Sequence, residues 1–388
     1  MPNIFDYLEW RCDIPFSADP FNEVDNLILA ELAYTDFSGC LREGERTPLR
    51  EAREKFFGTH SRELISKSDD PLTRAPLLMD GMAEGSRFGS LRVSDYVNIV
   101  DADKNMQMSA VTFLLDDGTA YIAFRGTDNT VVGWKEDFIM SYMPETGGQR
   151  QAIEYLSRTG KRLRRPLRVG GHSKGGNFAV YASAFCDTAV QDKIVAVYSN
   201  DGPGFRKEVT GTEEYCNITS RVVSIVPELS VIGMLLSSQS GRHVTVQSSV
   251  KGFSQHDGMT WQVKRNRFVR TEQSDVGRFI RDTQKSWLSK IDDESRESFV
   301  NSLFSLFEST GHDTFEEIGA GKFKSLDSII SAIQSMPKGK QQEFTRILGE
   351  LLLSGKQTVL RSLSDMKEEI EKEIKRRNGD RGNGSKSS

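Results

Sequence analysis

The residues best suited to chemistry lie in the run GGHSKGG at residues 170–176, which places the pattern G-x-S-x-G around Ser173. A serine on a tight turn between a strand and a helix needs flanking glycines, because side chains there would meet the neighbouring strands. The turn exposes the hydroxyl above the carboxyl edge of the sheet, at the positive end of the helix. We expect Ser173 to be a nucleophile and the backbone N–H of Lys174 to stabilise an oxyanion. The alternative is a glycine-rich turn with an idle serine.

A second motif, FRGTD at residues 124–128, stands at the end of another strand-like segment. Gly126 permits close approach of the backbone, and Thr127 offers both an N–H and a hydroxyl as hydrogen-bond donors. We expect this loop to supply the second oxyanion donor. The alternative is a turn that ends the strand and is capped by Thr127 and Asp128.

The two motifs together resemble those of class 3 (fungal-type) lipases in the α/β-hydrolase superfamily. Those enzymes carry an FRGT or FRGS oxyanion loop, a tryptophan-acidic segment (here GWKED at residues 133–137) and a GHSLGG elbow. More closely, residues 1 to about 270 resemble a bacterial family known as Mbeg1-like, through YLEWR, PFNEVDNLILAELAY, GWKEDF, GHSKGGNFAVY, SNDGPGF, VPELSVIGMLL and QHDGMTW. The resemblance implies a hydrolase fold and no particular activity. Lys174 replaces the usual leucine of the lipases, and its charge weighs against a lipid substrate.

In this superfamily the catalytic base is a histidine that follows the nucleophile and the acid in the chain. Three histidines follow Ser173, namely His243, His256 and His312. His243 precedes alternating valines, which indicates the start of a strand, and His312 lies in the helical tail, where a surface helix end is expected. We expect His256 to be the base, because its loop follows the last strand-like segment and lets the ring reach the serine. The alternative is a surface histidine paired with Asp257.

Two carboxylates compete for the role of triad acid. Asp201 follows the strand after the elbow helix, and Glu228 follows the next strand, the commoner place in class 3 lipases. We favour Asp201, because the Gly-Pro-Gly turn that follows it would fix a buried carboxylate. The same residues also favour a turn that has no catalytic role. Asp257 is poorly placed to orient the ring of its own neighbour. The apolar segment 229–236 is expected either to cover the cleft or to pack in the core.

These motifs require an α/β-hydrolase fold with a doubly wound, mostly parallel sheet. From about 91 to 270, strand-like runs alternate with helical ones, which implies parallel strands joined by crossover helices. Within this core, DDG at residues 116–118 predicts a hairpin between segments 109–115 and 120–124. We expect residues 1–90 to form a mostly helical segment packed on the core, residues 271–376 a helical region, and residues 377–388 a disordered tail.

Composition excludes several classes of protein. The 388 residues include 51 Lys and Arg against 55 Asp and Glu, and a net charge of −4 gives no global attraction to nucleic acid. The four cysteines are too far apart for a CxxC pair and indicate reduced thiols of a cytoplasmic protein. We expect neither a signal peptide nor a transmembrane segment, and without a metal-binding or nucleotide-binding motif we expect no cofactor.

The sequence therefore predicts a serine hydrolase that acts on an ester, thioester or lipid-like acyl substrate. The expected partner is a small acyl compound, peripheral contact with a membrane is compatible with this prediction, and the oligomeric state is left open. The sequence is compatible with two alternatives. One is a non-catalytic scaffold on a hydrolase fold, whose C-terminal helices dock a partner, and the other is a serine peptidase, since the same triad cleaves amides.

Overall fold

The computed structural model describes residues 1–41, 44–128, 130–230, 241–274 and 292–308. The chain divides into two compact units. One consists of residues 1–128 and 143–281, and the other of residues 129–142 and 282–388. Every candidate residue of the triad and of the oxyanion loops belongs to the first unit. His312, most of the apolar segment 229–236 and the predicted tail lie outside the described residues.

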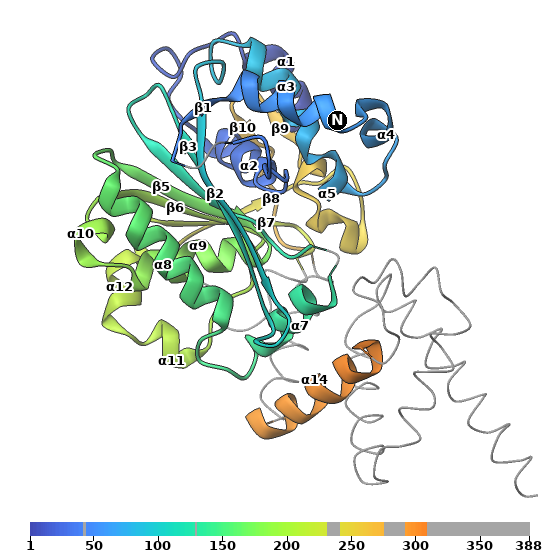
Figure 1. Ribbon diagram of the computed structural model, residues 1–388, viewed down its shortest axis with the longest axis vertical. Coiled ribbons are helices and arrows are strands. Elements are labelled where there is room, and N and C mark those ends of the chain that lie inside the picture. The colour runs from blue at the N-terminus through green and yellow to red at the C-terminus, as the bar shows by residue number, and fades with distance from the viewer. Residues whose placement is uncertain (42–43, 129, 231–240, 275–291, 309–388) are drawn as a thin grey trace, which may run out of the picture. The chain divides into compact units, whose positions relative to one another are not determined.

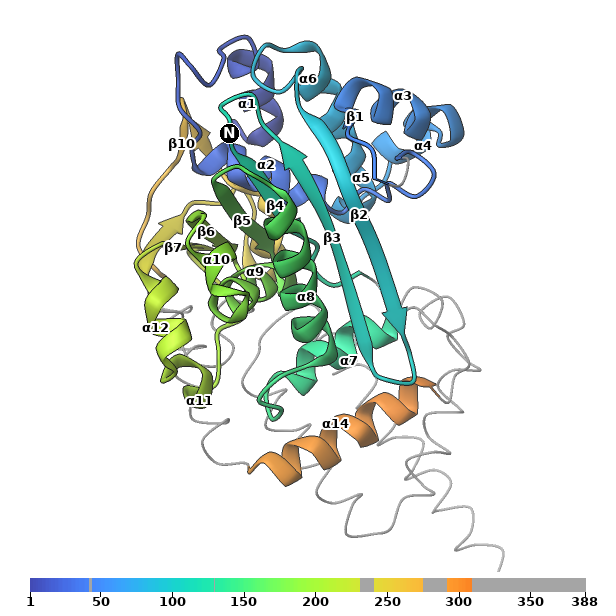
Figure 2. The ribbon, with the colours of Figure 1, turned by 60° about the vertical axis from the view of Figure 1, so that its left-hand side comes forward.

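Eight strands among the described residues of the first unit form one mixed sheet, in which each strand pairs with the next along the chain (Figure 1 and Figure 2). The strands are β1 (Thr47–Pro48), β2 (Arg92–Asp101), β3 (Met106–Leu114), β4 (Ala120–Phe124), β5 (Leu167–His172), β6 (Ile194–Asn200), β7 (Val222–Pro227) and β8 (Arg242–Val246). Pairs from β1 to β4 are antiparallel, and pairs from β4 to β8 are parallel. The predicted α/β class with a mostly parallel sheet is thus confirmed.

The predicted hairpin joins β3 to β4. Asp117 accepts a hydrogen bond from the backbone N–H of Thr119 (2.9 Å), and Gly118 has a φ of +82°, which glycine adopts at low cost. Both strands are buried along their whole length, as expected where helices cover the sheet. The hairpin brings the FRGTD motif, which begins at the last residue of β4, to the carboxyl edge of the parallel strands.

The helices that join the parallel strands within this unit lie on one face of the sheet. They are α8 (Gly147–Arg162), α9 (Lys174–Phe185), α10 (Thr188–Gln191), α11 (Lys207–Thr210) and α12 (Glu213–Thr219). Helix α8 packs on α9, and α9 packs on β5 and β6 (Figure 1). Right-handed crossovers that always move to the next strand return each helix to the same face, which explains this arrangement.

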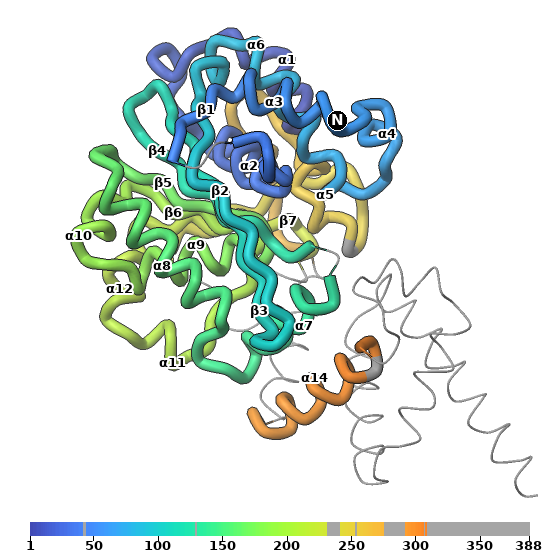
Figure 3. The backbone as a smooth tube through the Cα atoms, viewed as in Figure 1, coloured from blue at the N-terminus to red at the C-terminus, as the bar shows by residue number. Residues whose placement is uncertain are grey.

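Helices of the N-terminal segment cover the other face. They are α1 (Ile4–Arg11), α2 (Glu23–Leu32), α3 (Leu49–Thr59), α4 (Arg62–Ser66), α5 (Pro71–Arg74) and α6 (Leu78–Glu84). Asn22 starts α2 with a capping box that it shares with Asp25, and almost every later residue of α2 is buried. The backbone trace shows α2 on the side of β5 and β6 opposite to α9 (Figure 3). Both faces therefore carry helices, as in a doubly wound sheet, but the second face is covered by the N-terminal segment rather than by alternating crossovers.

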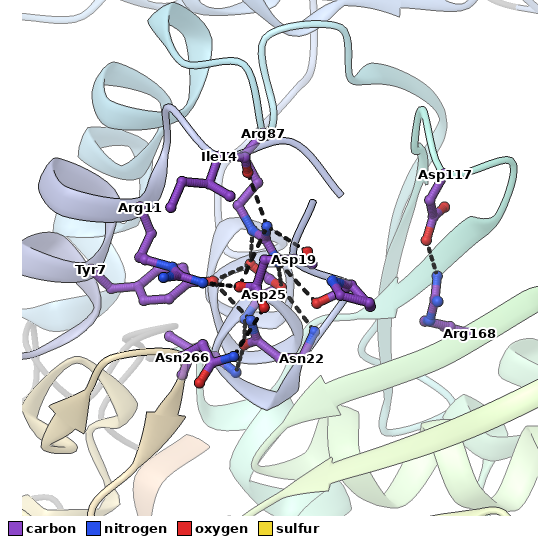
Figure 4. A network of polar contacts seen from close by, with 12 residues as sticks. Tyr7, Arg11, Ile14, Asp19, Asn22, Asp25, Arg87, Asp117, Arg168 and Asn266 are labelled. Atoms are coloured by element: carbon purple, nitrogen blue, oxygen red, sulfur yellow. Dashed lines mark hydrogen bonds and ion pairs between the residues drawn. The ribbon is translucent and has the colours of Figure 1, made fainter. Parts of the chain in front are cut away.

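Figure 4 shows the polar network that fixes the N-terminal helices. Asp25 and Arg87 form a fully buried ion pair, with Arg87 Nε 2.7 Å from Asp25 Oδ1 and Nη2 2.5 Å from Oδ2. The Tyr7 hydroxyl donates a hydrogen bond to Asp25 Oδ1 (2.9 Å), and Arg87 also donates to three backbone carbonyls of residues 14–20. The network therefore links α1, α2 and the segment after α6, and since every charged atom has a partner it leaves no uncompensated buried charge.

His243 lies in β8, as expected from its alternating valines. After β8, the chain forms the loop that carries His256. Two 3₁₀ turns, η2 (Gly252–His256) and η3 (Gly258–Thr260), precede a short hairpin of β9 (Val263–Lys264) and β10 (Arg267–Phe268). The fully buried indole of Trp261 donates a hydrogen bond to the carbonyl of Gln255 (2.8 Å). The loop is thereby anchored one residue before His256.

The described part of the second unit contains α7 (Val131–Ile139) and α14 (Asp293–Glu308). The rings of Phe138 and Phe304 pack edge to face with centroids 5.6 Å apart, and Lys135 Nζ lies 2.8 Å from Glu308 Oε1. Helix α14 lies within the helical region expected at residues 271–376, and the part of that region beyond residue 308 lies outside the described residues.

The four cysteines, Cys12, Cys40, Cys186 and Cys216, are all free thiols, and Cys216 is the exposed one. Burial raises the pKa of Cys12 and of Cys186 to about 12, so these two thiols are protonated and unreactive at neutral pH. Among the described helices, none combines the length and the apolar character needed to cross a membrane.

Candidate active site

Ser173 stands on the turn between β5 and α9 in a strained conformation, with φ +55° and ψ −133°. The glycines on either side of it leave no space for a side chain. A Cβ atom on Gly171 would lie 2.4 Å from the backbone of Gly175, and one on Gly175 would lie 2.1 Å from the Phe124 carbonyl oxygen. The strand, turn and helix predicted from G-x-S-x-G are therefore present. A serine held at positive φ is a typical mark of a functional site.

The FRGTD loop runs directly beside this turn. A Cβ atom on Gly126 would lie 3.0 Å from the Cβ of Ser173 and 2.6 Å from the carbonyl oxygen of His172. The following residue, Thr127, is partly exposed, whereas Arg125 is buried and donates hydrogen bonds to Asn98 and Asp128. The structure thus brings Gly126 into contact with the serine and leaves Thr127 accessible next to it.

Asp201 and His256 are joined by a short hydrogen bond. Asp201 follows β6 at a φ of +48°, and its Oδ2 lies 2.6 Å from Nδ1 of His256. The Asp201 side chain is completely buried, while that of His256 is 20% exposed. Because Nδ1 donates to the carboxylate, Nε2 is the unprotonated nitrogen of neutral His256.

The surroundings of Asp201 fix its position. Its N–H donates to the carbonyl of Ile225 on β7 (2.8 Å), and its Oδ1 accepts a hydrogen bond from the hydroxyl of Ser230. The amide of Asn177 on α9 donates to the carbonyls of Pro203 and Gly204, so the turn after Asp201 is held against the elbow helix. We did not identify Ser230 or Asn177 from the sequence, where neither has a distinguishing local pattern.

Glu228, the alternative acid, follows β7 and has a different partner. Its Oε1 accepts a hydrogen bond from Nε2 of Gln255 (3.2 Å). Asp257 caps η3, since its Oδ1 accepts from the N–H of Met259 (2.9 Å), and burial raises its pKa. The structure therefore brings His256 together with Asp201. The hydrogen bonds of Glu228 and Asp257 described above are made within or to the loop that carries His256.

Hydrogen bonds that involve adjacent residues hold the three candidate triad residues close together. The N–H of Ser173 donates to the carbonyl of Asn200 (2.9 Å), which immediately precedes Asp201. On the other side, Nε2 of His172 lies 2.7 Å from the carbonyl oxygen of His256. Ser173, Asp201 and His256 thus lie on one edge of the sheet, where the carboxyl ends of β5 and β6 meet.

Helix α2 supports this edge through a buried amide pair. Asn26 on α2 donates to Oδ1 of Asn200 (2.8 Å) and accepts from the hydroxyl of Tyr121 (2.6 Å). Asn200 in turn donates to the carbonyl of Gly171 (3.0 Å), so the ends of β5 and β6 are fixed side by side. The sequence offered no signal for this role of Asn26, because it depends on how α2 packs on the sheet.

The side chain of Lys174 is buried, although its backbone starts α9. Its Nζ donates a hydrogen bond to Oε1 of Gln107 on β3 (3.0 Å) and lies 5.7 Å from the ring centre of Phe178. The ammonium group of Lys174, which weighed against a lipid substrate, is therefore buried and hydrogen-bonded inside the protein. The backbone N–H of Lys174 remains at the first position of α9, where the helix dipole favours a developing negative charge.

The described residues contain no group of histidine, cysteine and carboxylate side chains that could hold a metal ion. A hollow of about 540 Å³ lies away from the candidate site. Its lining includes Arg242, Lys264 and Arg267 and none of the residues discussed above as a triad or oxyanion candidate.

Fold and site together define a protein of the α/β-hydrolase type, with a strained serine turn between a strand and a helix of a mostly parallel sheet. The chain belongs to the Mbeg1-like family, whose sequence model matches residues 82–305. No curated protein matches the chain.

Several solved lipase structures are similar to the chain at a low level. The structure of M37 lipase has 13% sequence identity and a TM-score of 0.35, over 54% of this chain and 68% of that one. A triacylglycerol lipase from Penicillium expansum has 13% identity and a TM-score of 0.31, over 64% and 90%. The Rhizomucor miehei lipase propeptide complex has 15% identity and a TM-score of 0.32, over 43% and 58%.

Proposed function

We propose that this protein is a serine hydrolase that cleaves an ester or thioester bond of an acyl substrate. The observation that carries the proposal is the strained conformation of Ser173 on the same sheet edge as the His256–Asp201 pair. A strained nucleophile turn and a carboxylate-bound histidine each occur without catalysis. Their joint presence at the carboxyl edge of a parallel sheet supports a triad.

In the proposed reaction, the Ser173 hydroxyl attacks the acyl carbon and its proton passes to Nε2 of His256. The negative charge of Asp201 stabilises the imidazolium through the hydrogen bond at Nδ1. The oxygen of the tetrahedral intermediate accepts hydrogen bonds from the backbone N–H groups of Lys174 and Thr127. The intermediate collapses when the leaving alcohol or thiol takes the proton from His256.

Water then completes the cycle. It attacks the acyl-enzyme ester, gives its proton to Nε2 of His256, and forms a second tetrahedral intermediate in the same oxyanion site. Its collapse releases a carboxylic acid and returns the proton to Ser173. A hydroxyl nucleophile needs no metal for this chemistry, because the imidazole accepts the proton as the new bond forms.

A panel of p-nitrophenyl esters of increasing acyl length tests the proposal. We expect the wild-type protein to hydrolyse at least one ester, and Ser173→Ala to lower kcat by about 10⁶-fold, the loss typical of a triad nucleophile. Ser183→Ala is the matched control, because Ser183 is a buried serine of the same helix whose hydroxyl donates to the carbonyl of Ala179. Near-wild-type turnover by folded Ser173→Ala would reject Ser173 as the nucleophile. A parallel set of p-nitroanilides distinguishes ester from amide hydrolysis.

A further inference from the structure

A second histidine, His172, packs against the proposed base. It precedes Ser173 in the chain, is buried, and its ring centre lies 4.6 Å from that of His256, with the planes inclined by 34°. Its Nε2 lies 2.7 Å from the carbonyl oxygen of His256, and its Nδ1 lies 3.1 Å from the hydroxyl of Tyr34, which follows α2. Both ring nitrogens are thus bound, one of them to the backbone of the proposed base.

These two partners determine the protonation state of His172. A carbonyl oxygen accepts a hydrogen bond and never donates one, so Nε2 must carry the proton. The Tyr34 hydroxyl can then donate to Nδ1, and both contacts are satisfied by the neutral ring. Burial holds the pKa of His172 well below its ordinary value, and the charge of the neighbouring His256 acts in the same direction. His172 therefore stays neutral when the neighbouring imidazole is protonated.

Glu31, one turn before Tyr34, does not disturb this arrangement. Its Oε1 is buried, accepts no hydrogen bond from the described residues, and lies 3.7 Å from Nδ1 of His172. Burial, and then the charge of Asp257, raise the pKa of Glu31 well above its ordinary value. The neutral form of Glu31, which burial favours, supplies no charge that would hold a proton on Nδ1.

Tyr34 also contacts the FRGTD loop. A Cβ atom on Gly126 would lie 2.1 Å from the Tyr34 hydroxyl oxygen, so the oxygen and the glycine backbone are in van der Waals contact. One hydroxyl from the N-terminal segment therefore touches both the residue before the nucleophile and the loop of Thr127. A segment outside the parallel core thus reaches the centre of the site.

We propose that His172 is a positioning residue that fixes the backbone of His256, and that Tyr34 selects the tautomer of His172 that can do so. The inference rests on the proposed function in one respect, namely that His256 is the base. Without the N–H at Nε2, the carbonyl of His256 loses its donor and the loop can move relative to Ser173. A displacement of this kind lowers kcat and leaves substrate binding nearly unchanged.

The test combines kinetics with proton NMR of the full-length protein. The proton between Nδ1 of His256 and Asp201 is strongly hydrogen-bonded, so it should give a separate downfield resonance that disappears in His256→Ala. His172→Phe keeps a planar ring but removes both hydrogen bonds. We expect it to lower kcat by about tenfold or more, to change KM by less than about twofold, and to move or broaden the resonance. His172→Gln, which restores an N–H donor, should recover most of kcat and the resonance position.

Tyr34→Phe and Tyr155→Phe form a matched pair of controls. Both remove a buried tyrosine hydroxyl, but that of Tyr155 binds Thr112 and the carbonyl of Asp95, away from His256. We expect Tyr34→Phe to shift the resonance and lower kcat, and Tyr155→Phe to lower the melting temperature alone.

An unchanged resonance and unchanged kcat in both His172→Phe and Tyr34→Phe would overturn the inference. So would a failure of His172→Gln to recover what His172→Phe loses. If His172→Phe does not fold, Tyr34→Phe and His172→Gln decide the question by the same two readouts. The NMR readout needs no turnover, so a protein that hydrolyses no ester would refute the proposed function while the resonance still tests the positioning.

Discussion

The hydrogen bond between His256 and Asp201 is the contact whose removal is most informative. Asp201 uses both oxygens, because Oδ2 accepts from Nδ1 of His256 (2.6 Å) and Oδ1 accepts from the hydroxyl of Ser230. Asp201→Asn preserves the size of this fully buried side chain and removes its charge. In the proposed mechanism, the imidazolium of His256 then loses its counter-ion.

The orientation of the new amide sets the size of the effect. If its NH₂ group faces His256, the ring must adopt the tautomer that leaves no base at Nε2, a change that costs about 10⁴-fold in a serine protease. If the NH₂ group faces Ser230, the hydroxyl can accept instead of donate and the useful tautomer survives. Loss of the charge alone, at about 3 kcal/mol, corresponds to about 100-fold. We expect the loss in kcat of Asp201→Asn to lie between these two limits. Adding Ser230→Ala to Asp201→Asn should move the loss toward the larger limit.

The assay is ester hydrolysis by purified variants, with circular dichroism and melting temperature as tests of folding. Glu228→Gln is the matched control, since Glu228 accepts a hydrogen bond from Gln255 and a glutamine of the same size preserves the packing. We expect this control to retain kcat within about tenfold of wild type. A large loss in Glu228→Gln together with a small loss in Asp201→Asn would refute the assignment and favour the acid position common in class 3 lipases.

Two further predictions concern buried ionisable groups of the N-terminal segment. Asp25→Asn leaves Arg87 buried without its counter-ion and should lower the free energy of unfolding, measured by urea titration, by about 3–5 kcal/mol. Glu63→Gln breaks an exposed pair with Lys67 and should change this free energy by less than about 0.5 kcal/mol. Equal effects of the two substitutions would contradict the reasoning. The pKa of Glu31 is raised in the folded state. Its contribution to stability is therefore fully present below the pKa that Glu31 has in the unfolded chain, and it is lost as the pH rises through the pKa that Glu31 has in the folded protein. The loss amounts to at most about 1.4 kcal/mol per pH unit. Glu31→Gln should remove this dependence, and identical stability profiles of the two proteins between about pH 5 and pH 8 would refute it.

Local sequence patterns predicted the parts of the fold that depend on neighbouring residues. The hairpin follows from DDG because Gly118 supplies the positive φ of the turn. The elbow follows from the glycines around Ser173, since the close approach of Phe124 excludes any other residue at Gly175. The position of His243 in a strand follows from its alternating valines.

The parts that depend on contacts between distant segments were not predictable in the same way. Asp201 and Glu228 follow adjacent parallel strands, so their order in the chain does not determine which of them reaches His256. The direction of the Lys174 side chain depends on Gln107, which lies far away in the chain on strand β3. The cover of the second sheet face by α2, and with it the approach of Tyr34 to the site, likewise requires the tertiary packing of an apolar helix.

The most direct test of the central claim is labelling with a fluorophosphonate, which reacts with a serine that an adjacent base activates. We predict that the folded wild-type protein is labelled, that the peptide carrying the label contains Ser173, and that labelling is lost in Ser173→Ala and retained in Ser183→Ala. Heat-denatured protein should not react, because the activation depends on His256 and the oxyanion amides being in place. Folded wild-type protein that remains unlabelled, or a label that persists in Ser173→Ala, would contradict the assignment of Ser173 as the nucleophile of a serine hydrolase.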